Sequence, residues 1–243
     1  MFGAAINDEI LEAAKLDTNE ICGVIVDGLP VFLPNTSDDP ETEFRIAEIP
    51  EGIEAVFHSH PGGPFYPTLM DMRQQIAMDI PWGIASYSDR HSEVFWFGAG
   101  APKQPLVGRG FRHGVSDCYS LVQDFYDEVH GLEIMDVPRS WEWWANDESL
   151  YEDLFRKAGF TQISVDEILP GDAFLATIRS KTANHAGVYL GDGLILHHTC
   201  GRDGYDPFRL STVEPAARWF NFLSKVVRYE NAEIDRSVGQ KVW

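Results

Sequence analysis

The sequence predicts a mixed α/β (α+β) protein of two domains, with residues 1–98 and 108–243 as the domains and residues 99–107 as the linker between them. Apolar residues recur every three or four positions near residues 8–16 and 117–129, which is the period of an amphipathic helix. Short apolar runs bounded by turn residues separate these stretches and are typical of strands. The linker is rich in small residues, Gly and Pro and has no periodicity, which favours a domain boundary there.

The composition limits the classes of function that the chain can have. Its 38 acidic side chains outnumber 19 basic ones, so the net charge is −19. This charge argues against nucleic acid or an anionic membrane as the main partner, since both favour basic patches. No apolar run approaches the ~18 residues that a membrane-spanning helix needs, so we expect no membrane insertion.

The N-terminus and the cysteines indicate where the protein is made. The chain begins without the basic region of a signal peptide and reaches Asp8 and Glu9 early. Cys22, Cys118 and Cys200 are an odd number of cysteines at wide spacing, which is not a disulfide framework. We therefore expect synthesis in a reducing cytoplasm.

The first half is expected to fold as an α/β sandwich of about 100 residues. The predicted elements are a helix at residues 8–16, strands at 21–26, 31–33, 44–46 and 53–57, a helix at 68–78, and strands at 82–87 and 94–97. Asp27 and Gly28 mark a turn between the second and third elements. Pro81 ends the second helix.

The stretch from His58 to Asp71 carries the candidate site of the first half. Residues two apart in a strand point to the same side, so His58 and His60 present two imidazoles together. The helix that begins near Thr68 adds the carboxylate of Asp71. Two neutral imidazoles and one carboxylate are three ligands of a Zn²⁺ site with an open fourth position, which is typical of hydrolytic zinc enzymes. The competing interpretation is that Thr68 and Asp71 only form a capping box.

The spacing of these residues resembles the signature of the JAMM (MPN-plus) metalloproteases. The resemblance implies a zinc site made by His58, His60 and Asp71, and hydrolysis of an amide or isopeptide bond. It also implies that Glu20 acts as general base, because Glu20 precedes a Cys-Gly pair and an apolar strand as in that family. Thr68, where the family usually has Ser, would assist the tetrahedral intermediate, although its β-branch stiffens the rotamer.

The second half is expected to begin with a helix that carries a candidate nucleophile. The apolar stripe that starts at Asp117 places Cys118 in the first turn. A helix N-terminus lowers the pKa of a thiol, so we expect a reactive thiolate. A small buried cysteine is the alternative. The other predicted elements are a helix at residues 147–158, a strand at 173–178, a hairpin at 184–198 and a last strand at 219–229.

The hairpin carries the candidate base. A catalytic thiol needs an imidazole, and the imidazole needs an orienting group. Gly-Asp-Gly at residues 191–193 lies between two apolar runs and predicts the hairpin turn. A three-residue loop would pair Leu190 with Leu194 and make His185 and His197 diagonal neighbours on one face. A two-residue turn would bring His198, the residue after His197, to that face instead.

These residues form a predicted site in which Cys118 is the nucleophile, His185 the general base and His197 the group that orients the base. An Asp-Cys pair that opens a helix, followed by two histidines on a hairpin, resembles the NlpC-type papain-like peptidases. The resemblance implies a papain-like α+β fold and hydrolysis of peptidoglycan stem peptides through a thioester on Cys118. The usual helix start in that family is Asp-Cys-Ser-Gly-Leu, whereas residues 117–121 read Asp-Cys-Tyr-Ser-Leu.

A JAMM-like half followed by an NlpC-like half resembles the tail tip assembly proteins of lambda-like phages. The shared segments are residues 58–71, 108–124, 184–198 and the Trp-rich stretch 140–144, which would cap the core or line a peptide groove. The resemblance implies other tail tip proteins and bacterial peptidoglycan as partners, synthesis in the host cytoplasm, and action at the tail tip, in the periplasm or at the cell wall. The alternatives are a tail assembly factor or structural adaptor with residual peptidase sites, and a cytosolic isopeptidase similar to deubiquitinases, which explains only the first half.

Overall fold

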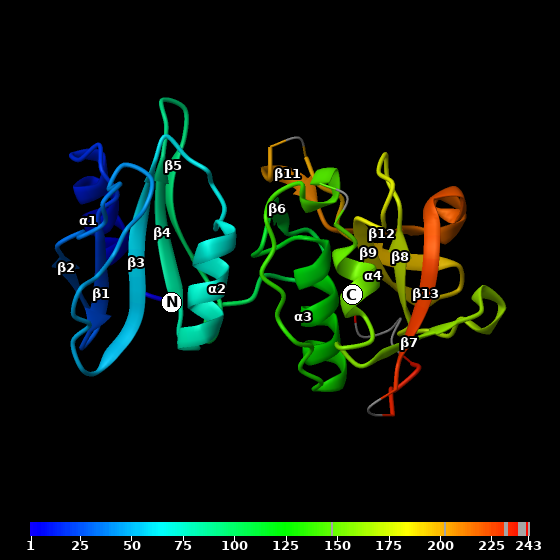
Figure 1. Cartoon of the computed structure of the whole chain (residues 1–243). Coiled ribbons are helices and arrows are strands. Elements are labelled where there is room, and N and C mark those ends of the chain that lie inside the picture. The colour runs from blue at the N-terminus through cyan, green and yellow to red at the C-terminus, as the bar shows by residue number, and fades with distance from the viewer. Residues whose placement is uncertain (147, 202, 231–232, 238–241, 243) are drawn as a thin grey trace. The chain divides into compact units, whose positions relative to one another are not determined.

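The chain folds into two compact units, Met1–Pro102 and Lys103–Trp243, each of which is described by itself (Figure 1). A computed structural model describes residues 1–146, 148–201, 203–230, 233–237 and 242. The division between Pro102 and Lys103 falls inside the predicted linker. Each unit has its own sheet and its own buried core, so each can be treated as a separate framework for a site.

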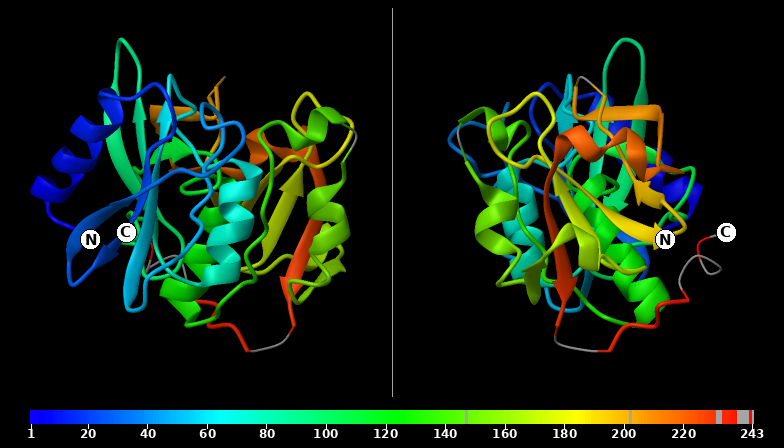
Figure 2. Two further views of the ribbon diagram at one scale, coloured as in Figure 1. Left: turned by 60° about the vertical axis from the view of Figure 1, so that its left-hand side comes forward. Right: turned by 90° about the vertical axis from the view of Figure 1, so that its right-hand side faces the viewer.

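The first unit is a five-stranded sheet with one helix on each face (Figures 1 and 2). Its elements are α1 (Ala4–Lys15), β1 (Cys22–Val26), β2 (Leu29–Leu33), β3 (Ile53–Pro61), α2 (Leu69–Met78), β4 (Trp82–Tyr87) and β5 (Ser92–Phe97). The strand order is β2-β1-β3-β4-β5. β3 and β4 are parallel and are joined through α2, whereas the other neighbours are antiparallel.

The alternation of side chains along β3 places the candidate site of this unit. Phe57 packs in one core cluster with Ile10 and Ala14 of α1. His58 and His60 therefore point to the opposite face of the sheet, where α2 lies. The fold thus puts the two imidazoles on the side of the helix that carries Asp71.

One predicted strand of the first unit is wrong. Residues 44–46 have no regular structure. The backbone N–H of Thr36 instead donates to the carbonyl of Arg45 at 2.9 Å, which closes a loop. Phe44 turns inward and stacks on the ring of His58, with centroids 4.4 Å apart. The apolar residues in this segment pack against the site and do not join the sheet.

The second unit is built on a six-stranded antiparallel sheet in the order β12-β10-β9-β8-β13-β7. Its elements are β6 (Gly110–Arg112), α3 (Cys118–His130), α4 (Leu150–Leu154), β7 (Phe160–Ile163), β8 (Ala173–Ala176), β9 (His185–Gly191), β10 (Leu194–His197), β11 (Tyr205–Leu210), β12 (Thr212–Pro215) and β13 (Leu223–Tyr229). β6 and β11 form a separate two-stranded sheet. Helices and sheets in both units confirm the predicted mixed α/β class.

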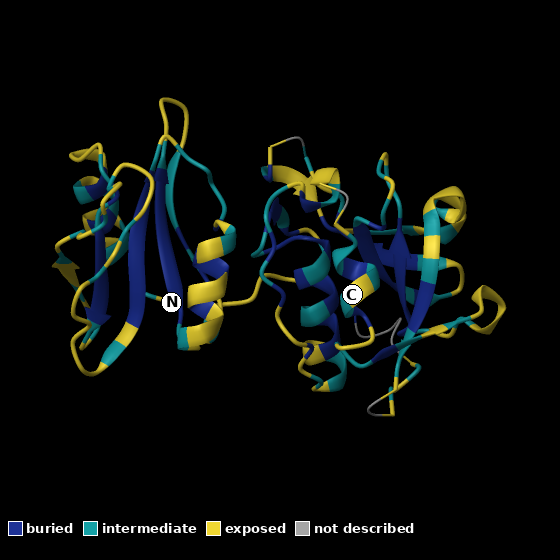
Figure 3. Ribbon diagram, in the orientation of Figure 1, coloured by how far each residue is buried: buried dark blue, intermediate teal, exposed yellow. Residues whose placement is uncertain are grey.

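The main core of the second unit lies between α3 and one face of this sheet. Leu121 and Phe125 of α3 pack with Val188 of β9 and Leu196 of β10. Figure 3 shows dark blue, buried segments along α3 and the central strands, and yellow segments at the loops. Trp143 is 1% exposed and belongs to the same cluster, so at this residue the Trp-rich stretch caps the core.

Several elements of the second unit differ from the sequence prediction. Strands β6, β7, β11 and β12 were not predicted, because polar residues or Pro interrupt all four and none forms an apolar run. The helix predicted for residues 147–158 is the five-residue α4, and residue 147 itself lies outside the described residues. The last strand begins at Leu223, because a 3₁₀ turn at Phe220–Phe222, which follows another at Ala216–Arg218, occupies the start of the predicted strand.

Candidate functional site

The three predicted zinc ligands converge in the first unit. The Nε2 atoms of His58 and His60 are 3.0 Å apart, and oxygens of Asp71 lie 3.2 Å from the former and 3.4 Å from the latter. Tetrahedral Zn²⁺ with bonds of about 2.0–2.1 Å separates its ligand atoms by about 3.3 Å. The measured separations are close to this value, and all three side chains are buried. The donor set therefore fits one zinc ion.

A hydrogen bond at Nδ1 of His60, the ring nitrogen that faces away from the candidate zinc site, fixes the orientation of the ring. Its Nδ1 lies 2.9 Å from the carbonyl oxygen of Pro64. A carbonyl can only accept, so Nδ1 carries the hydrogen and Nε2 presents its lone pair to the cluster. Burial lowers the pKa of His58, whereas bonding to Asp71 raises the pKa of His60 against the effect of burial. Neutral imidazoles are the form that binds a metal.

Glu20, the predicted general base, is buried two residues before β1. It lines the same pocket as His60, Thr68 and Asp71. Burial raises the pKa of Glu20 to about 7, with His60 opposing the rise and Asp71 contributing to it. A carboxyl group with this pKa can accept and release a proton near neutral pH.

Thr68 is the N-cap of α2, and its hydroxyl is bound to the candidate ligand. The hydroxyl donates to Asp71 Oδ2 at 2.7 Å and accepts from the backbone N–H of Asp71 at 3.2 Å. The backbone N–H of Thr68 donates to the same Oδ2 at 2.7 Å. The same hydrogen bonds therefore cap α2 and orient the candidate ligand. The reciprocal bonds of the capping box hold one oxygen of Asp71 and direct the other oxygen toward His58.

Cys118 is the first residue of α3, and Asp117 is its N-cap. The thiol is 8% exposed, its Sγ lies 3.2 Å from the hydroxyl of Tyr151, and it is hydrogen-bonded to the backbone of Ala186. Burial raises the pKa of Cys118 to about 12, and the charge of Asp117 adds to the rise. The predicted lowered pKa is therefore wrong for this structure, because desolvation and a neighbouring carboxylate outweigh the helix N-terminus.

A buried ion pair holds the N-terminus of α3. The guanidinium of Arg139 donates to both oxygens of Asp117, with distances of 2.7 and 2.8 Å from Nη2 and 3.0 Å from Nε. The carboxylate also accepts from two backbone N–H groups of the first helical turn at 3.0 Å. These partners hold the pKa of Asp117 far below its usual range against the effect of burial. Sequence reasoning found Asp117 but missed Arg139.

The hairpin of β9 and β10 brings the two predicted histidines together. Its turn has two residues, Asp192 and Gly193, with φ of 51° and 72°, in place of the three residues predicted. A register shift after Leu194 restores the predicted pairing, so His197 stands opposite Gly187 and diagonal to His185. His185 Nε2 and His197 Nδ1 are 3.0 Å apart.

The thiol and the imidazole pair are connected to adjacent residues at the start of β9. Ala186 faces the core under α3, so the ring of His185 lies on the other face, beside Phe174 and Trp219. Among the described residues no hydrogen bond joins Cys118 to the ring of His185. The connection runs through Ala186, the next residue along the strand. The structure thus pairs the two histidines and places the thiol one residue away from them.

Glu214, a carboxylate that the sequence analysis missed, extends the hydrogen-bonded pair of His185 and His197. Glu214 Oε1 lies 2.6 Å from His197 Nε2. It also accepts from the indole N–H of Trp219 at 3.0 Å. The sequence contains no signal for Glu214, because β12, the strand that carries it, was not predicted.

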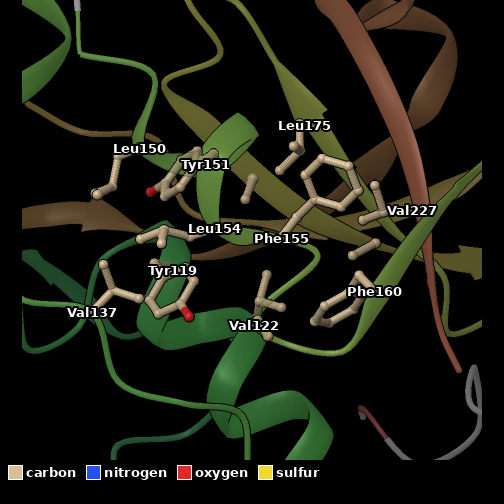
Figure 4. Close-up of a pocket in the computed structure, with 13 residues that line it drawn as sticks. Tyr119, Val122, Val137, Leu150, Tyr151, Leu154, Phe155, Phe160, Leu175 and Val227 are labelled. Carbon is tan, nitrogen blue, oxygen red and sulfur yellow. The ribbon is translucent and has the colours of Figure 1, made fainter. Parts of the chain in front are cut away.

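An apolar pocket adjoins the thiol. Tyr151 and Ala186, the two partners of Cys118, are among the residues that line it (Figure 4). The other lining residues are Tyr119, Val122, Val137, Leu150, Leu154, Phe155, Ala158, Phe160, Ala173, Leu175 and Val227. Most of the thirteen lining residues come from α3, α4 and the strands β7, β8, β9 and β13, and all have hydrocarbon or aromatic side chains. The short helix α4 therefore covers both the thiol and a space suited to apolar groups.

The sequence of this unit matches a known family. The model of the NlpC/P60 family matches residues 94–221, just over half of the chain. The chain belongs to the NlpC/P60 family. All residues of the thiol site, from Cys118 to Glu214, lie within the part of the chain that matches the NlpC/P60 model.

Two phage proteins are similar over longer stretches than the NlpC/P60 model. The tail tip assembly protein K of Escherichia phage lambda is 39% identical over 152 residues, which cover 63% of this chain and 72% of that protein. The protein of the same name from Escherichia phage N15 is 28% identical over 233 residues, which cover 90% of this chain and 91% of that protein. The second match extends across both units, so the likeness includes the half that the family model leaves largely uncovered.

Solved structures of NlpC/P60 proteins overlap the chain only loosely. The NlpC/p60 domain of the peptidoglycan hydrolase SagA is 21% identical and covers 51% of this chain and 89% of its own, with a TM-score of 0.34. An NlpC/P60 family protein of Bacillus cereus is 15% identical and covers 92% of this chain and 66% of its own, with a TM-score of 0.33.

In the part of the chain that the structure describes, no helix has the length and apolar character to cross a bilayer.

Proposed function

We propose that the second unit is a cysteine peptidase that cleaves stem peptides of bacterial peptidoglycan, with Cys118 as nucleophile, His185 as general base and His197 as the group that orients it. The observation that carries the proposal is the 3.0 Å contact between His185 and His197 at the strand end that binds the thiol. Membership of the NlpC/P60 family, a family of cysteine peptidases, supports hydrolysis.

The reaction needs the thiol proton to reach His185. Burial, together with His197, holds the pKa of His185 well below its usual range, so the ring is neutral and can accept a proton. The thiolate then attacks the peptide carbonyl carbon, and the imidazolium returns the proton to the leaving amine, which gives a thioester on Cys118. Water, deprotonated by His185, hydrolyses the thioester and restores the thiol. Because burial keeps the resting thiol protonated, proton transfer must accompany substrate binding.

We further propose that the first unit is a zinc-dependent hydrolase of amide or isopeptide bonds. His58, His60 and Asp71 would hold the ion, a role supported by separations of 3.0–3.4 Å between their ligand atoms. Bound zinc supplies Lewis-acid activation of water and of the scissile carbonyl. Glu20 would carry the proton, since its raised pKa suits that task. Thr68 would hold Asp71 in place, and its predicted assistance to the tetrahedral intermediate would require its hydroxyl to leave Asp71.

The phage relatives support a place for both activities. We propose that the protein is made in the host cytoplasm and acts at the phage tail tip, with other tail tip proteins and the cell wall as partners, during tail assembly or genome entry. The alternative is a tail assembly factor or structural adaptor without turnover. One observation favours that alternative, namely the burial of Cys118 against Tyr151, which leaves the thiol 8% exposed.

Release of muropeptides from purified peptidoglycan tests the proposal. The full chain is compared with Cys118→Ala and with the double variant His58→Ala, His60→Ala. We expect release by the wild type and by the double variant, and none by Cys118→Ala. Loss of release only in the double variant would assign wall cleavage to the metal unit. No release by a folded wild type would favour the assembly factor.

A further inference from the structure

The carboxylate of Glu214 forms the end of a continuous hydrogen-bonded row on the second sheet. His197 lies in β10, between β9 and β12. Its Nδ1 is 3.0 Å from His185 Nε2 on one side, and its Nε2 is 2.6 Å from Glu214 Oε1 on the other. Both ring nitrogens of His197 are therefore used, and each is bonded to one neighbour.

Strand register produces this row. His197 pairs directly with Gly187 of β9 and with Thr212 of β12. His185 and Glu214 are each two residues from those partners, so both are diagonal neighbours on the face of His197. Gly187 is needed for this close strand packing, since a Cβ there would lie 2.6 Å from the carbonyl oxygen of Leu196 and 2.6 Å from the ring of Phe174. The arrangement thus depends on three adjacent strands and on one glycine.

Glu214 is held as an ionised acceptor. Its Oε1 accepts from Trp219 Nε1 at 3.0 Å and its Oε2 from Arg218 Nη1 at 3.1 Å. Burial alone would raise its pKa, but these donors and His197 lower it below the usual value. An ionised carboxylate has no hydrogen to donate, so the hydrogen in the bond to His197 must lie on Nε2 of the ring.

The position of that hydrogen determines the rest of the row. Burial lowers the pKa of His197, so the ring is neutral and carries one hydrogen. With this hydrogen on Nε2, Nδ1 of His197 has a lone pair and accepts from Nε2–H of His185. His185 is neutral too, and its one hydrogen is then also on Nε2. The lone pair of His185 is thereby left on Nδ1.

We propose that Glu214 is a positioning residue for the thiol site, which fixes the tautomers of His197 and His185 and so leaves Nδ1 of His185 as the basic atom. This inference rests on the proposed peptidase function of the second unit. When the thiol of Cys118 is deprotonated, its proton passes to Nδ1, and the Nε2–H of the imidazolium stays bonded to His197. Glu214 remains ionised throughout and stabilises the positive charge through His197.

Nitrogen NMR of the full chain labelled with ¹⁵N-histidine tests this directly, because protonated and unprotonated ring nitrogens have well separated shifts. Signals of His185 and His197 are assigned with single His→Gln variants. We expect both rings to carry hydrogen on Nε2 in the wild type. Glu214→Ala should shift both rings toward a mixture of tautomers. Glu214→Gln should retain the wild-type tautomers, since its amide oxygen can still accept from Nε2–H.

Alkylation of Cys118 by iodoacetamide gives a second readout that requires no wall substrate. At neutral pH we expect Glu214→Ala to react roughly tenfold more slowly than the wild type, because the base is no longer fixed. Arg218→Ala is the matched control, since it removes a bond to Glu214 Oε2 and leaves His197 untouched. Its rate should stay within about twofold of the wild type, as expected for an exposed pair.

The two readouts separate this inference from the proposed function. Unchanged tautomers in Glu214→Ala, or hydrogen on Nδ1 of His197 in the wild type, would overturn the role of Glu214. A wild type that has the expected tautomers but releases no muropeptides would overturn the substrate and leave the role of Glu214 intact. Alkylation could instead slow equally in Arg218→Ala and Glu214→Ala without a change in tautomers. Glu214 would then serve only to hold the turn that contains Trp219.

Discussion

Each unit buries one aspartate at the N-terminus of a helix beside its site, and the two aspartates have different partners. Asp71 of α2 contacts two imidazoles, His58 and His60. Asp117, the N-cap of α3, contacts the guanidinium of Arg139. Among the residues that the structure describes, no Arg or Lys is hydrogen-bonded to the first carboxylate, whereas the second has one at hydrogen-bond distance.

The difference explains what each carboxylate can do. The charge of Asp71 is stabilised against burial by two imidazoles that can themselves bind a metal, so the arrangement around Asp71 favours a metal ion. Asp117 is already neutralised, and its oxygens are used by the helix N-terminus and by Arg139. It therefore organises the turn that presents Cys118. The counter-charge, more than the position in the helix, determines the role.

The largest expected effect comes from removing the counter-charge of Asp117. Arg139→Met should destabilise the second unit by roughly 3–5 kcal/mol at neutral pH, because it leaves a buried charge unpaired. The pKa of Asp117 is lowered in the folded state, so the ion pair stabilises above the ordinary pKa of about 4. This contribution is lost as pH falls toward the lower folded value. The gap between variant and wild type should therefore shrink in acid.

Hydrogen exchange followed by peptide mass spectrometry measures this effect in each unit separately. Faster exchange is expected in peptides of α3 and β9 and not in those of the first unit. Arg156→Met, which removes an exposed arginine, is the control and should leave exchange unchanged. An equal effect of the two substitutions would mean that the Asp117–Arg139 pair adds nothing specific.

The converse experiment adds a counter-charge to Asp71. Zinc at 100 times its Kd should stabilise the first unit by about 2.7 kcal/mol, because only the folded state offers the assembled ligands. Thermal unfolding with and without zinc measures the gain, and metal analysis after dialysis gives the stoichiometry. Asp71→Ala should abolish the gain, whereas Asp89→Ala, at an exposed position of the same unit, should retain it. A gain that survives in Asp71→Ala would place the ion elsewhere.

A smaller effect is expected from the hydroxyl that contacts the thiol. The bond from Tyr151 lowers the pKa of Cys118 against the rise caused by burial. Tyr151→Phe should therefore raise the midpoint of the pH profile of Cys118 alkylation further, by up to about one pH unit for one hydrogen bond. Tyr119→Phe is the control, since its hydroxyl donates to the carbonyl of Met135 and not to the thiol. A downward shift in Tyr151→Phe would show that the hydroxyl stabilises the neutral thiol.

The smallest effect concerns the cap that aims Asp71. Thr68→Ala should cost about 1 kcal/mol of stability through loss of the N-cap. It should also weaken zinc binding, measured by calorimetric titration, because Oδ2 of Asp71 loses its 2.7 Å bond from the hydroxyl. Thr68→Ser keeps the hydroxyl and should behave as the wild type in both measurements. A large loss in Thr68→Ser would instead show that the β-branch itself matters.

The sequence predicts the convergence of His58, His60 and Asp71 more directly than that of the residues around Cys118, for a physical reason. His58, His60, Thr68 and Asp71 lie on one strand, one turn and one helix start, so local periodicity alone brings their side chains together. The thiol site spans Cys118 to Glu214 and depends on the pairing of three strands. Its histidine pair was predictable because one hairpin contains both members.

The residues that were missed act over long sequence distances. Arg139 lies in a segment without regular structure, and Tyr151 lies on a five-residue helix. Neither their burial nor their direction follows from a pattern. The protonation of Cys118 was mispredicted for a related reason. The helix N-terminus can be inferred from sequence, but the desolvation that outweighs it is a property of the packed core.

The length of the hairpin turn at Asp192 and Gly193 determines which face of the sheet each residue of β10 occupies. Side chains of a strand alternate with a period of two, so deleting one residue from this turn without a compensating bulge would turn β10 over. His197 would leave the row and the adjacent His198 would enter it, while Glu214 on β12 would have to re-register separately. Because His197 and His198 are consecutive, a single deletion in the turn would replace one imidazole by the other. The length of one loop, rather than the identity of a side chain, selects which histidine occupies the site.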